Sequence, residues 1–140
     1  MIRPFRTNTD ADLLIAGEVD AFSRSYPGSE VPLDLVTNRV RAIDSGQVIC
    51  SVLDIDGPQG YVIATKRIGL ANAEIYIVSV YVAPTQRGRG HAGKLIESLL
   101  ETSVSNEVIL DVSVGNEAAV SSYQALGFEV TRLRMVRTFP

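Results

Sequence analysis

The sequence predicts an α+β fold in which a mixed β-sheet carries helices on both faces. Three apolar strands are expected at residues 48–53, 61–67 and 74–82, and the short loops between them are typical of an antiparallel meander. An amphipathic helix and a further apolar strand follow the meander. This order of strand, helix and strand predicts a right-handed crossover between parallel strands. Two amphipathic helices precede the meander and complete the pattern.

The elements before the meander are predicted from breaking residues and apolar spacing. A first strand at 2–6 belongs at the edge of the sheet, because Pro4 lacks the N–H that a central strand donates. The first helix is expected at about 10–23, with an inner face of Leu13, Ala16, Gly17 and Ala21. The second helix is expected at about 32–43, with an inner face of Leu33, Val36, Val40 and Ile43.

The elements after the meander follow the same logic. A helix at about 90–103 has five apolar side chains spaced to share one face: Ala92, Leu95, Ile96, Leu99 and Leu100. A buried strand is expected at 108–112, and then a helix that Asn116 caps and Gly127 ends. One or two strands are expected at 128–139, and a turn near 69–72 joins the last two strands of the meander. Residues 1–140 are therefore predicted to form a single domain.

Composition argues against several classes of protein. With 13 basic and 16 acidic residues the net charge is −3, whereas general nucleic-acid binding favours a basic excess. No apolar run approaches the roughly 20 residues that span a bilayer, and the first residues lack the apolar core of a signal peptide. One cysteine and one histidine do not make a zinc site of the usual kind, so no metal is expected. A reducing compartment is expected, namely the cytoplasm.

The segment between the third strand of the meander and the next helix concentrates glycine and basic residues. It consists of Arg87, Gly88, Arg89, Gly90, His91, Ala92, Gly93 and Lys94. Glycine lets a ligand approach the backbone, and the first amides of a helix lack intrahelical acceptors and lie at the positive end of its dipole. The segment is therefore predicted to bind a phosphate or pyrophosphate. A Walker-type loop is excluded, because Leu95 stands where Ser or Thr would follow the lysine.

Two motifs resemble those of the GCN5-related N-acetyltransferase (GNAT) family. The first, Arg87-x-x-Gly90-x-Ala92, is similar to the family's Gln/Arg-x-x-Gly-x-Gly/Ala signature, and it follows an apolar strand as it does in the family. The second, Asn116-x-x-Ala119-x-x-x-Tyr123-x-x-x-Gly127-Phe128, is similar to a downstream family pattern. The resemblance extends over essentially the whole chain, and it implies a GNAT-like fold. His91 departs from it, because this position is often apolar in the family.

The resemblance implies that the chain binds acetyl-coenzyme A between the strands at 74–82 and 108–112. The residues that it assigns to this binding are Val80, Tyr81, Val82, Arg87, Gly88, Arg89, Gly90, His91, Ala92, Gly93, Asn116 and Tyr123. The backbone of the strand is expected to pair with the pantetheine arm as an added strand does, and the Gly-rich segment is expected to hold the pyrophosphate. The amide of Asn116 is expected to contact the pantetheine.

The resemblance also implies direct attack of a primary amine on the thioester in a ternary complex, without a protein nucleophile. Tyr123 is expected to protonate the departing thiolate, and a backbone N–H near residues 80–82 to stabilise the carbonyl oxygen. Glu74 is the first candidate for the base that deprotonates the amine, ahead of Glu18 and Glu30. Ordinary structural roles remain open: Asn116 as a helix cap, Tyr123 as a core aromatic and Glu74 as a charge at a strand end. Cys50, within an apolar strand, is expected to be buried and inert.

The predicted activity is transfer of an acetyl group from acetyl-coenzyme A to a primary amine of a small molecule or protein. Two alternatives stay open: a non-catalytic acyl-coenzyme A-binding module of the same fold, and an RNA-contacting domain that uses the Arg-Gly segment. The first two helices are expected to form the acceptor pocket. The sequence leaves the acceptor, the acyl-chain preference and the oligomeric state open, with a homodimer through the C-terminal strands as one arrangement.

Overall fold

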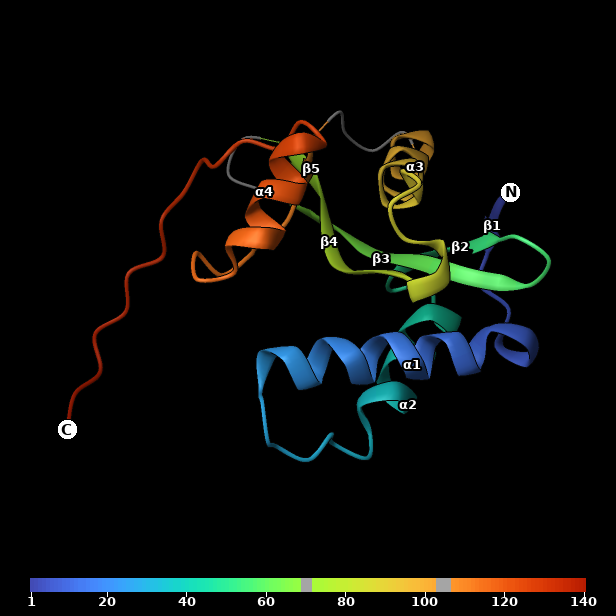
Figure 1. Cartoon of the computed structure of the whole chain (residues 1–140), viewed down its shortest axis with the longest axis horizontal. Coiled ribbons are helices and arrows are strands. Elements are labelled where there is room, and N and C mark those ends of the chain that lie inside the picture. Colours follow the sequence, from blue (N-terminus) through green and yellow to red (C-terminus); the bar gives the residue numbers. More distant parts are fainter. Residues whose placement is uncertain (69–71, 103–106) are drawn as a thin grey trace. The chain divides into compact units, whose positions relative to one another are not determined.

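The computed structural model describes residues 1–68, 72–102 and 107–140, and within them five strands lie in chain order in one mixed sheet (Figure 1). The strands are β1 (Ile2–Pro4), β2 (Ile49–Asp54), β3 (Pro58–Ile68), β4 (Ala73–Val82) and β5 (Val108–Ile109). β1 to β4 pair antiparallel, and β5 pairs parallel to β4. The predicted meander, the parallel crossover and the edge position of the first strand are confirmed.

The chain divides into two units, Met1–Leu110 and Asp111–Pro140. The second unit contains α4 (Glu117–Ala125). In the first unit, α1 (Thr7–Ser25) and α2 (Leu35–Asp44) lie on one face of the sheet and α3 (His91–Ser98) lies on the other (Figure 1). The α+β fold class with helices on both faces is confirmed, whereas the single domain over 1–140 stays a prediction.

The middle of β3, residues 61–64, is buried on both faces of the sheet, and the alternation of its side chains explains why this stretch is apolar throughout. Tyr61 and Ile63 belong to the core under α1 and α2, together with Leu14, Cys50 and Val52. Successive side chains of a strand point to opposite faces, so Val62 and Ala64 are buried on the α3 face, where Leu95 and Leu99 of the helical segment are also buried. A strand covered on both sides is expected to be a continuous apolar run.

A buried arginine joins β1, α1 and β2. Arg3 on β1 donates hydrogen bonds of 2.7 and 2.8 Å to Asp10 on α1, and its Nε donates to Asp54 on β2 at 2.7 Å. Asp10 is fully buried and also accepts from the N–H of Arg6 at 2.7 Å. Burial alone would raise the pKa of Asp10, but the hydrogen bonds from Arg3, Arg6 and Thr9 outweigh it and hold this pKa below its ordinary value. The start of α1 is thereby fixed to the edge of the sheet.

Several predicted details of the helices are wrong. α1 begins at Thr7 and not at about residue 10. Asp10 lies within the first turn of the helix, where its side chain accepts the N–H of Arg6. Ala16 is exposed, since the buried face of α1 runs through Leu14, Gly17 and Glu18. Leu33 is fully exposed, because α2 begins only at Leu35.

The third helix also ends differently from its prediction. Leu100 is exposed, because the chain tightens after α3 into a 3₁₀ turn, η2 (Leu99–Thr102), which rotates this side chain away from the sheet. The predicted helix end at 103 lies outside the described residues, and so does most of the turn expected at 69–72.

The strands predicted at 128–139 are wrong, because the structure has no strand in this segment. Its large apolar side chains are exposed: Val130, Leu133, Met135, Val136 and Phe139. Alternating apolar residues do not suffice for a strand, which needs a neighbour to accept and donate its hydrogen bonds. Within the unit Asp111–Pro140 no described residue lies in a strand, so the homodimer predicted through these strands has no strands to form it. The strand expected at 108–112 is shortened to β5 (Val108–Ile109).

Replacing Asp10 with Asn is expected to lower the free energy of unfolding by about 3 kcal/mol at pH 7, because the buried Arg3 loses its main partner. The folded-state pKa of Asp10 is lowered, so its contribution is present above the unfolded pKa of about 3.9 and is lost as pH falls through the lower folded value. Urea titrations should therefore show the difference between wild type and variant shrinking below about pH 4.

The matched control is Asp20→Asn, on the same helix, where the carboxylate pairs with Arg24 at the surface. Such a pair contributes less than about 1 kcal/mol, so the control should stay close to wild type at every pH. A difference for Asp10→Asn that stayed constant from pH 7 to pH 2 would contradict the role given to the buried pair.

Candidate active site

The two edges of β4 are paired very unequally. On one side β4 pairs with β3 along its whole length, from Ala73 to Val82. On the other side it pairs with β5 only at Ile75 and Tyr76. Beyond Tyr76 no strand in the described part of the chain pairs with this edge. The second half of β4 therefore has one unpaired edge, the arrangement that the family resemblance implied for these two strands.

The backbone groups of Val80 and Val82 face the unpaired edge. The N–H of Ala83 donates to the carbonyl of Gln59 at 2.7 Å, which makes these two residues a hydrogen-bonded pair of the β3–β4 ladder. Hydrogen-bonded and non-hydrogen-bonded pairs alternate in antiparallel strands, so Val82 and Val80 turn their N–H and C=O groups away from β3. An extended ligand with amide groups can pair with them as an added strand does.

A β-bulge lies just before these residues. Ile63 pairs with Ser79 and Ala64 pairs with Ile77, so Val78 has no partner residue in β3. Val78 packs against the core on the α1 side of the sheet, and Ser79, opposite Ile63, points to that side as well. Bulges re-aim side chains in this way and are frequent beside active sites.

The Gly-rich segment is the turn from β4 into α3, after the short 3₁₀ turn η1 (Pro84–Gln86). Gly88 and Gly90 both have positive φ angles, +77° and +78°, and a Cβ on either would meet nothing within 4 Å. Glycine is therefore needed for the backbone conformation and leaves open space beside the chain. Among the described residues, no amide from Gly88 to Gly93 donates to a backbone carbonyl, and Lys94 is the first that does so, to Gly90 at 3.3 Å. The turn thus presents unsatisfied amides at the positive end of α3, which suits a phosphate.

The basic side chains of this turn are partly engaged within the protein. Arg87 donates from Nε to the carbonyl of Val82 at 2.9 Å, and its guanidinium lies 5.7 Å from the centre of the Tyr81 ring. Arg87 is thereby held against the end of β4, and one of the two carbonyls on the unpaired edge is already occupied. Arg89 donates to Gln86 at 3.4 Å, and Nδ1 of His91 is buried without a hydrogen bond to any described residue.

A second polar group is buried on the opposite face of the sheet, under α1. Glu18 is 4% exposed, and its Oε1 lies 3.7 Å from Nε of Arg39 on α2. Neither atom forms a hydrogen bond in the described part of the structure, and neither does Oη of Tyr61, which is 1% exposed. Native structures satisfy the great majority of their buried polar atoms, so three unsatisfied atoms together suggest a functional role.

The surroundings of Glu18 shift its proton affinity. Burial raises the pKa of Glu18, and the positive charge of Arg39 and the hydroxyls of Tyr61 and Ser79 offset only part of the increase. Burial also raises the pKa of Tyr61. The helix approaches this tyrosine so closely that a Cβ on Gly17 would lie 2.1 Å from Tyr61 Oη, which explains why glycine precedes Glu18.

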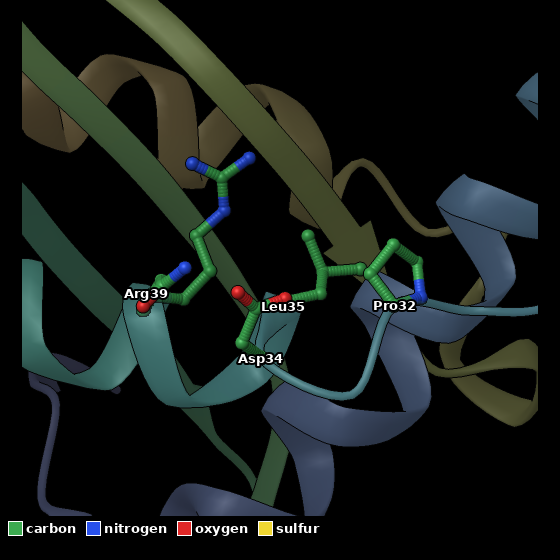
Figure 2. A pocket seen from close by; sticks show the side chains of 5 residues that line it. Pro32, Asp34, Leu35 and Arg39 are labelled. Atoms are coloured by element: carbon green, nitrogen blue, oxygen red, sulfur yellow. The ribbon is translucent and has the colours of Figure 1, made fainter.

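A pocket of about 360 Å³ opens at the start of α2, lined by Pro32, Asp34, Leu35, Asn38 and Arg39. Figure 2 shows the Arg39 side chain at one end of the pocket and Pro32 at the other, with Leu35 between them. Arg39, which lines the pocket, is also the residue whose Nε lies 3.7 Å from Oε1 of Glu18. One sequence signal points to this site: Glu18 and Arg39 are charged residues at helical spacing from the apolar Leu14 and Val36.

The other candidates for the base lie elsewhere. Glu74 accepts a hydrogen bond from Arg67 at 3.0 Å near the start of β4, about 20 Å along the strand from Val80. Glu30 is exposed in the segment between α1 and α2. The structure does not bring Glu74 and Glu18 together.

Asn116 and Tyr123 belong to the unit Asp111–Pro140. The side chain of Asn116 accepts from the N–H of Ala119 at 3.2 Å, which confirms its role as the cap of α4. The amides of Gly127 and Phe128 bond back to the carbonyls of Gln124 and Tyr123, at 3.0 Å each. These two bonds form a Schellman motif, and the rings of Tyr123 and Phe128 meet edge to face at 5.7 Å.

Three further observations concern the described residues as a set. None of their helices has both the length and the hydrophobicity to cross a bilayer. No group of three His, Cys, Asp or Glu side chains among them is placed to hold a metal ion. Cys50 is 7% exposed, and burial raises the pKa of its thiol to about 12, so the prediction of a buried thiol is confirmed.

Comparison with known proteins connects this geometry to a family. Residues 16–128 match the model of the acetyltransferase (GNAT) family. A segment of 61 residues, 44% of this chain, is 36% identical to an uncharacterized protein of Mycobacterium leprae (strain TN) and spans 17% of that protein's length.

Solved structures share the fold over the whole chain. A possible acetyltransferase from Clostridium difficile 630 has a TM-score of 0.78 at 20% identity, with 100% of this chain and 97% of that chain covered. AAC(6')-Iy, in complex with the bisubstrate analogue CoA-S-monomethyl-acetylneamine, has a TM-score of 0.76 at 21% identity, with 100% and 98% covered. An aminoglycoside acetyltransferase from an uncultured soil metagenomic sample has a TM-score of 0.67 at 24% identity, also with 100% and 98% covered.

Replacing Gly90 with Ala is expected to lower the free energy of unfolding by about 1 kcal/mol, because an L side chain is strained at this positive φ. Gly90→Asn is the matched control, since Asn tolerates the left-handed conformation better than Ala does. Urea titrations of the two variants should rank them wild type, Asn, Ala in decreasing stability. An alanine variant as stable as wild type would show that the turn does not need the left-handed conformation.

Proposed function

The chain belongs to the acetyltransferase (GNAT) family, and from this premise we propose that it transfers an acetyl group from acetyl-coenzyme A to a primary amine. The observation that carries the proposal is the combination of an unpaired edge on β4 with a turn of unsatisfied amides directly after it. A long donor with a diphosphate at one end and amides along its arm fits both features.

The donor is proposed to lie along the unpaired edge of β4. The pyrophosphate takes the amides from Gly88 to Gly93, with Arg87, Arg89 and His91 beside it. The pantetheine arm pairs with the backbone of Val80, and with the N–H of Val82, because the carbonyl of Val82 is held by Arg87. Tyr81, Ala92 and Asn116 complete the set of contacts that the family motifs assign.

The proposed reaction is direct attack of the amine nitrogen on the thioester carbonyl carbon. A C–N bond forms, the C–S bond breaks, and the nitrogen loses a proton to a base. Tyr123 is proposed to give its phenolic proton to the departing thiolate. A backbone N–H of residues 80–82 on the unpaired edge is proposed to stabilise the negative charge on the carbonyl oxygen.

The acceptor is proposed to be an amine-bearing small molecule or protein. Two of the similar structures bear on this point: one is named as an aminoglycoside acetyltransferase, and the other contains a coenzyme A–neamine analogue. Their identities to this chain, 24% and 21%, support the fold and leave the acceptor of this chain to experiment.

The experiment combines calorimetry with an acceptor screen. Titration with acetyl-coenzyme A and with coenzyme A should release or absorb heat with a stoichiometry of about one per chain. Incubation with acetyl-coenzyme A and spermidine, neamine, lysine or a peptide with an open N-terminus should then release a thiol in an amine-dependent manner. Binding without any transfer would favour a non-catalytic acyl-coenzyme A-binding module, and absence of binding would overturn the proposal.

Tyr123→Phe is expected to lower turnover about 10²-fold while leaving the dissociation constant of acetyl-coenzyme A unchanged, because only the proton donor is removed. The loss should be measured across a pH range with the best amine of the screen. Tyr26→Phe, which alters an exposed tyrosine after α1, is the control and should behave as wild type. Turnover of the Tyr123 variant at the wild-type level at every pH would exclude this proton donor.

A further inference from the structure

The buried carboxylate of Glu18 is poorly satisfied for a group with a purely structural role. A buried carboxylate that accepts one hydrogen bond or none destabilises a fold, because its charge has lost its hydration. An amide or apolar side chain of similar size avoids this desolvation penalty. Within the described residues its ionic partner is Arg39, whose Nε lies 3.7 Å from Oε1, and this oxygen accepts no hydrogen bond from any of them. Oε1 is thus shielded from solvent, and the hydroxyls of Tyr61 and Ser79 lower the pKa of the carboxyl only in part.

The position of Glu18 relates it to the half of β4 where the thioester is proposed to lie. The hydroxyl of Ser79, next to Val80 on β4, lowers the pKa of Glu18, and so does the hydroxyl of Tyr61 on β3. The bulge at Val78 is what turns Ser79 toward α1. The donor thus reaches β4 from the unpaired edge, and Glu18 approaches the same stretch of β4 from the α1 face.

The pocket and the carboxylate share one neighbour, because Arg39 lines the pocket and also approaches Glu18. The charged side chains of the pocket are Asp34 and Arg39, and Glu18 lies near Arg39, so the three together carry a net negative charge. Pro32 and Leu35 add an apolar wall. Such a lining fits an aliphatic ammonium, with its charge toward the carboxylates and its carbon body against Pro32 and Leu35.

We propose that Glu18 is the base that takes the proton from the acceptor amine, and that the pocket lined by Pro32, Asp34, Leu35, Asn38 and Arg39 admits a cationic aliphatic amine to it. The inference rests on the proposed acetyl transfer. An ammonium entering the pocket gives one proton to Oε1, and the neutral nitrogen then attacks the thioester carbonyl. As the C–S bond breaks, the second proton passes from nitrogen to water, and the thiolate takes the phenolic proton of Tyr123, which water then restores. Arg39 is a positioning residue that keeps the carboxylate aimed at the pocket.

Burial raises the pKa of Glu18, and the groups that face it keep their charge state around neutral pH. The groups that face it are Arg39 from α2, Tyr61 from β3, Ser79 from β4 and Cys50 from β2. Arginine stays charged, serine does not titrate, and the pKa values of Tyr61 and Cys50 are raised further above neutrality. Turnover is therefore expected to rise with pH as Glu18 loses its proton.

The test compares Glu18→Gln, Glu18→Asp and the control Asp20→Asn, which alters a surface carboxylate on the same helix. Turnover is measured from pH 5 to 9 with acetyl-coenzyme A and the four amines spermidine, neamine, lysine and a peptide with an open N-terminus. Circular dichroism and the dissociation constant of acetyl-coenzyme A establish that each variant is folded. Glu18→Gln should lose at least about 10²-fold in turnover and lose the rise with pH, while Glu18→Asp should be slower and keep the rise.

Asp34→Asn should raise KM more for spermidine than for lysine, which carries its own carboxylate.

The outcomes separate this inference from the proposed function. If wild type acetylates an amine and the folded Glu18→Gln variant does so equally well, with the same pH profile, the assignment of Glu18 is overturned and the acetyl transfer stands. If wild type binds acetyl-coenzyme A and acetylates none of the amines, the proposed transfer is overturned. The assignment of Glu18 as its base is then overturned as well. Loss of turnover and of the pH rise in Glu18→Gln alone supports the assignment.

Discussion

Every backbone polar group of a strand needs a partner, and in this protein that requirement is met unevenly on the two edges of β4. One edge is paired with β3 from end to end, which gives the strand a fixed register. The other edge is paired with β5 only at Ile75 and Tyr76. The stability of β4 therefore comes from β3, and the remaining N–H and C=O groups are left for a ligand. The Gly-rich turn depends on this arrangement, because the end of β4 fixes where the amides before α3 point.

The two buried charge clusters of the first unit differ in how well they are satisfied. Around Arg3 each carboxylate is hydrogen-bonded, and the cluster fixes β1, α1 and β2 to one another. Around Glu18 the atoms approach without bonding, although the burial is similar. A fully bonded network rigidifies a fold, and an incompletely bonded one costs stability. The contrast assigns the first cluster to architecture, and it is the reason for proposing a chemical role for the second.

Periodicity and turn residues predicted the meander, the crossover and the cap of α4, because these depend on local spacing and on one strong backbone preference. The same patterns failed at 128–139, where apolar alternation is present but no neighbouring strand supplies hydrogen bonds. The exposure of Leu33 and Leu100 was also beyond local patterns, since it depends on where each helix begins or tightens. For the candidate site, the Gly-rich turn was visible in the sequence, whereas the approach of Arg39 and Tyr61 to Glu18 arises only when α1, α2 and β3 pack together. Glu18 was named from the sequence after Glu74, because no local pattern distinguishes a buried glutamate from an exposed one.

The burial of Cys50 has a practical consequence for anyone who measures this chemistry. It is the single cysteine of the chain, and it lies under α1 with its thiol kept protonated by its surroundings. A chromogenic disulfide reagent reacts with thiolates that it can reach, so the folded protein itself should contribute almost no colour. The coenzyme released at each turnover would then be counted directly, and colour arising without coenzyme would report unfolding of the core.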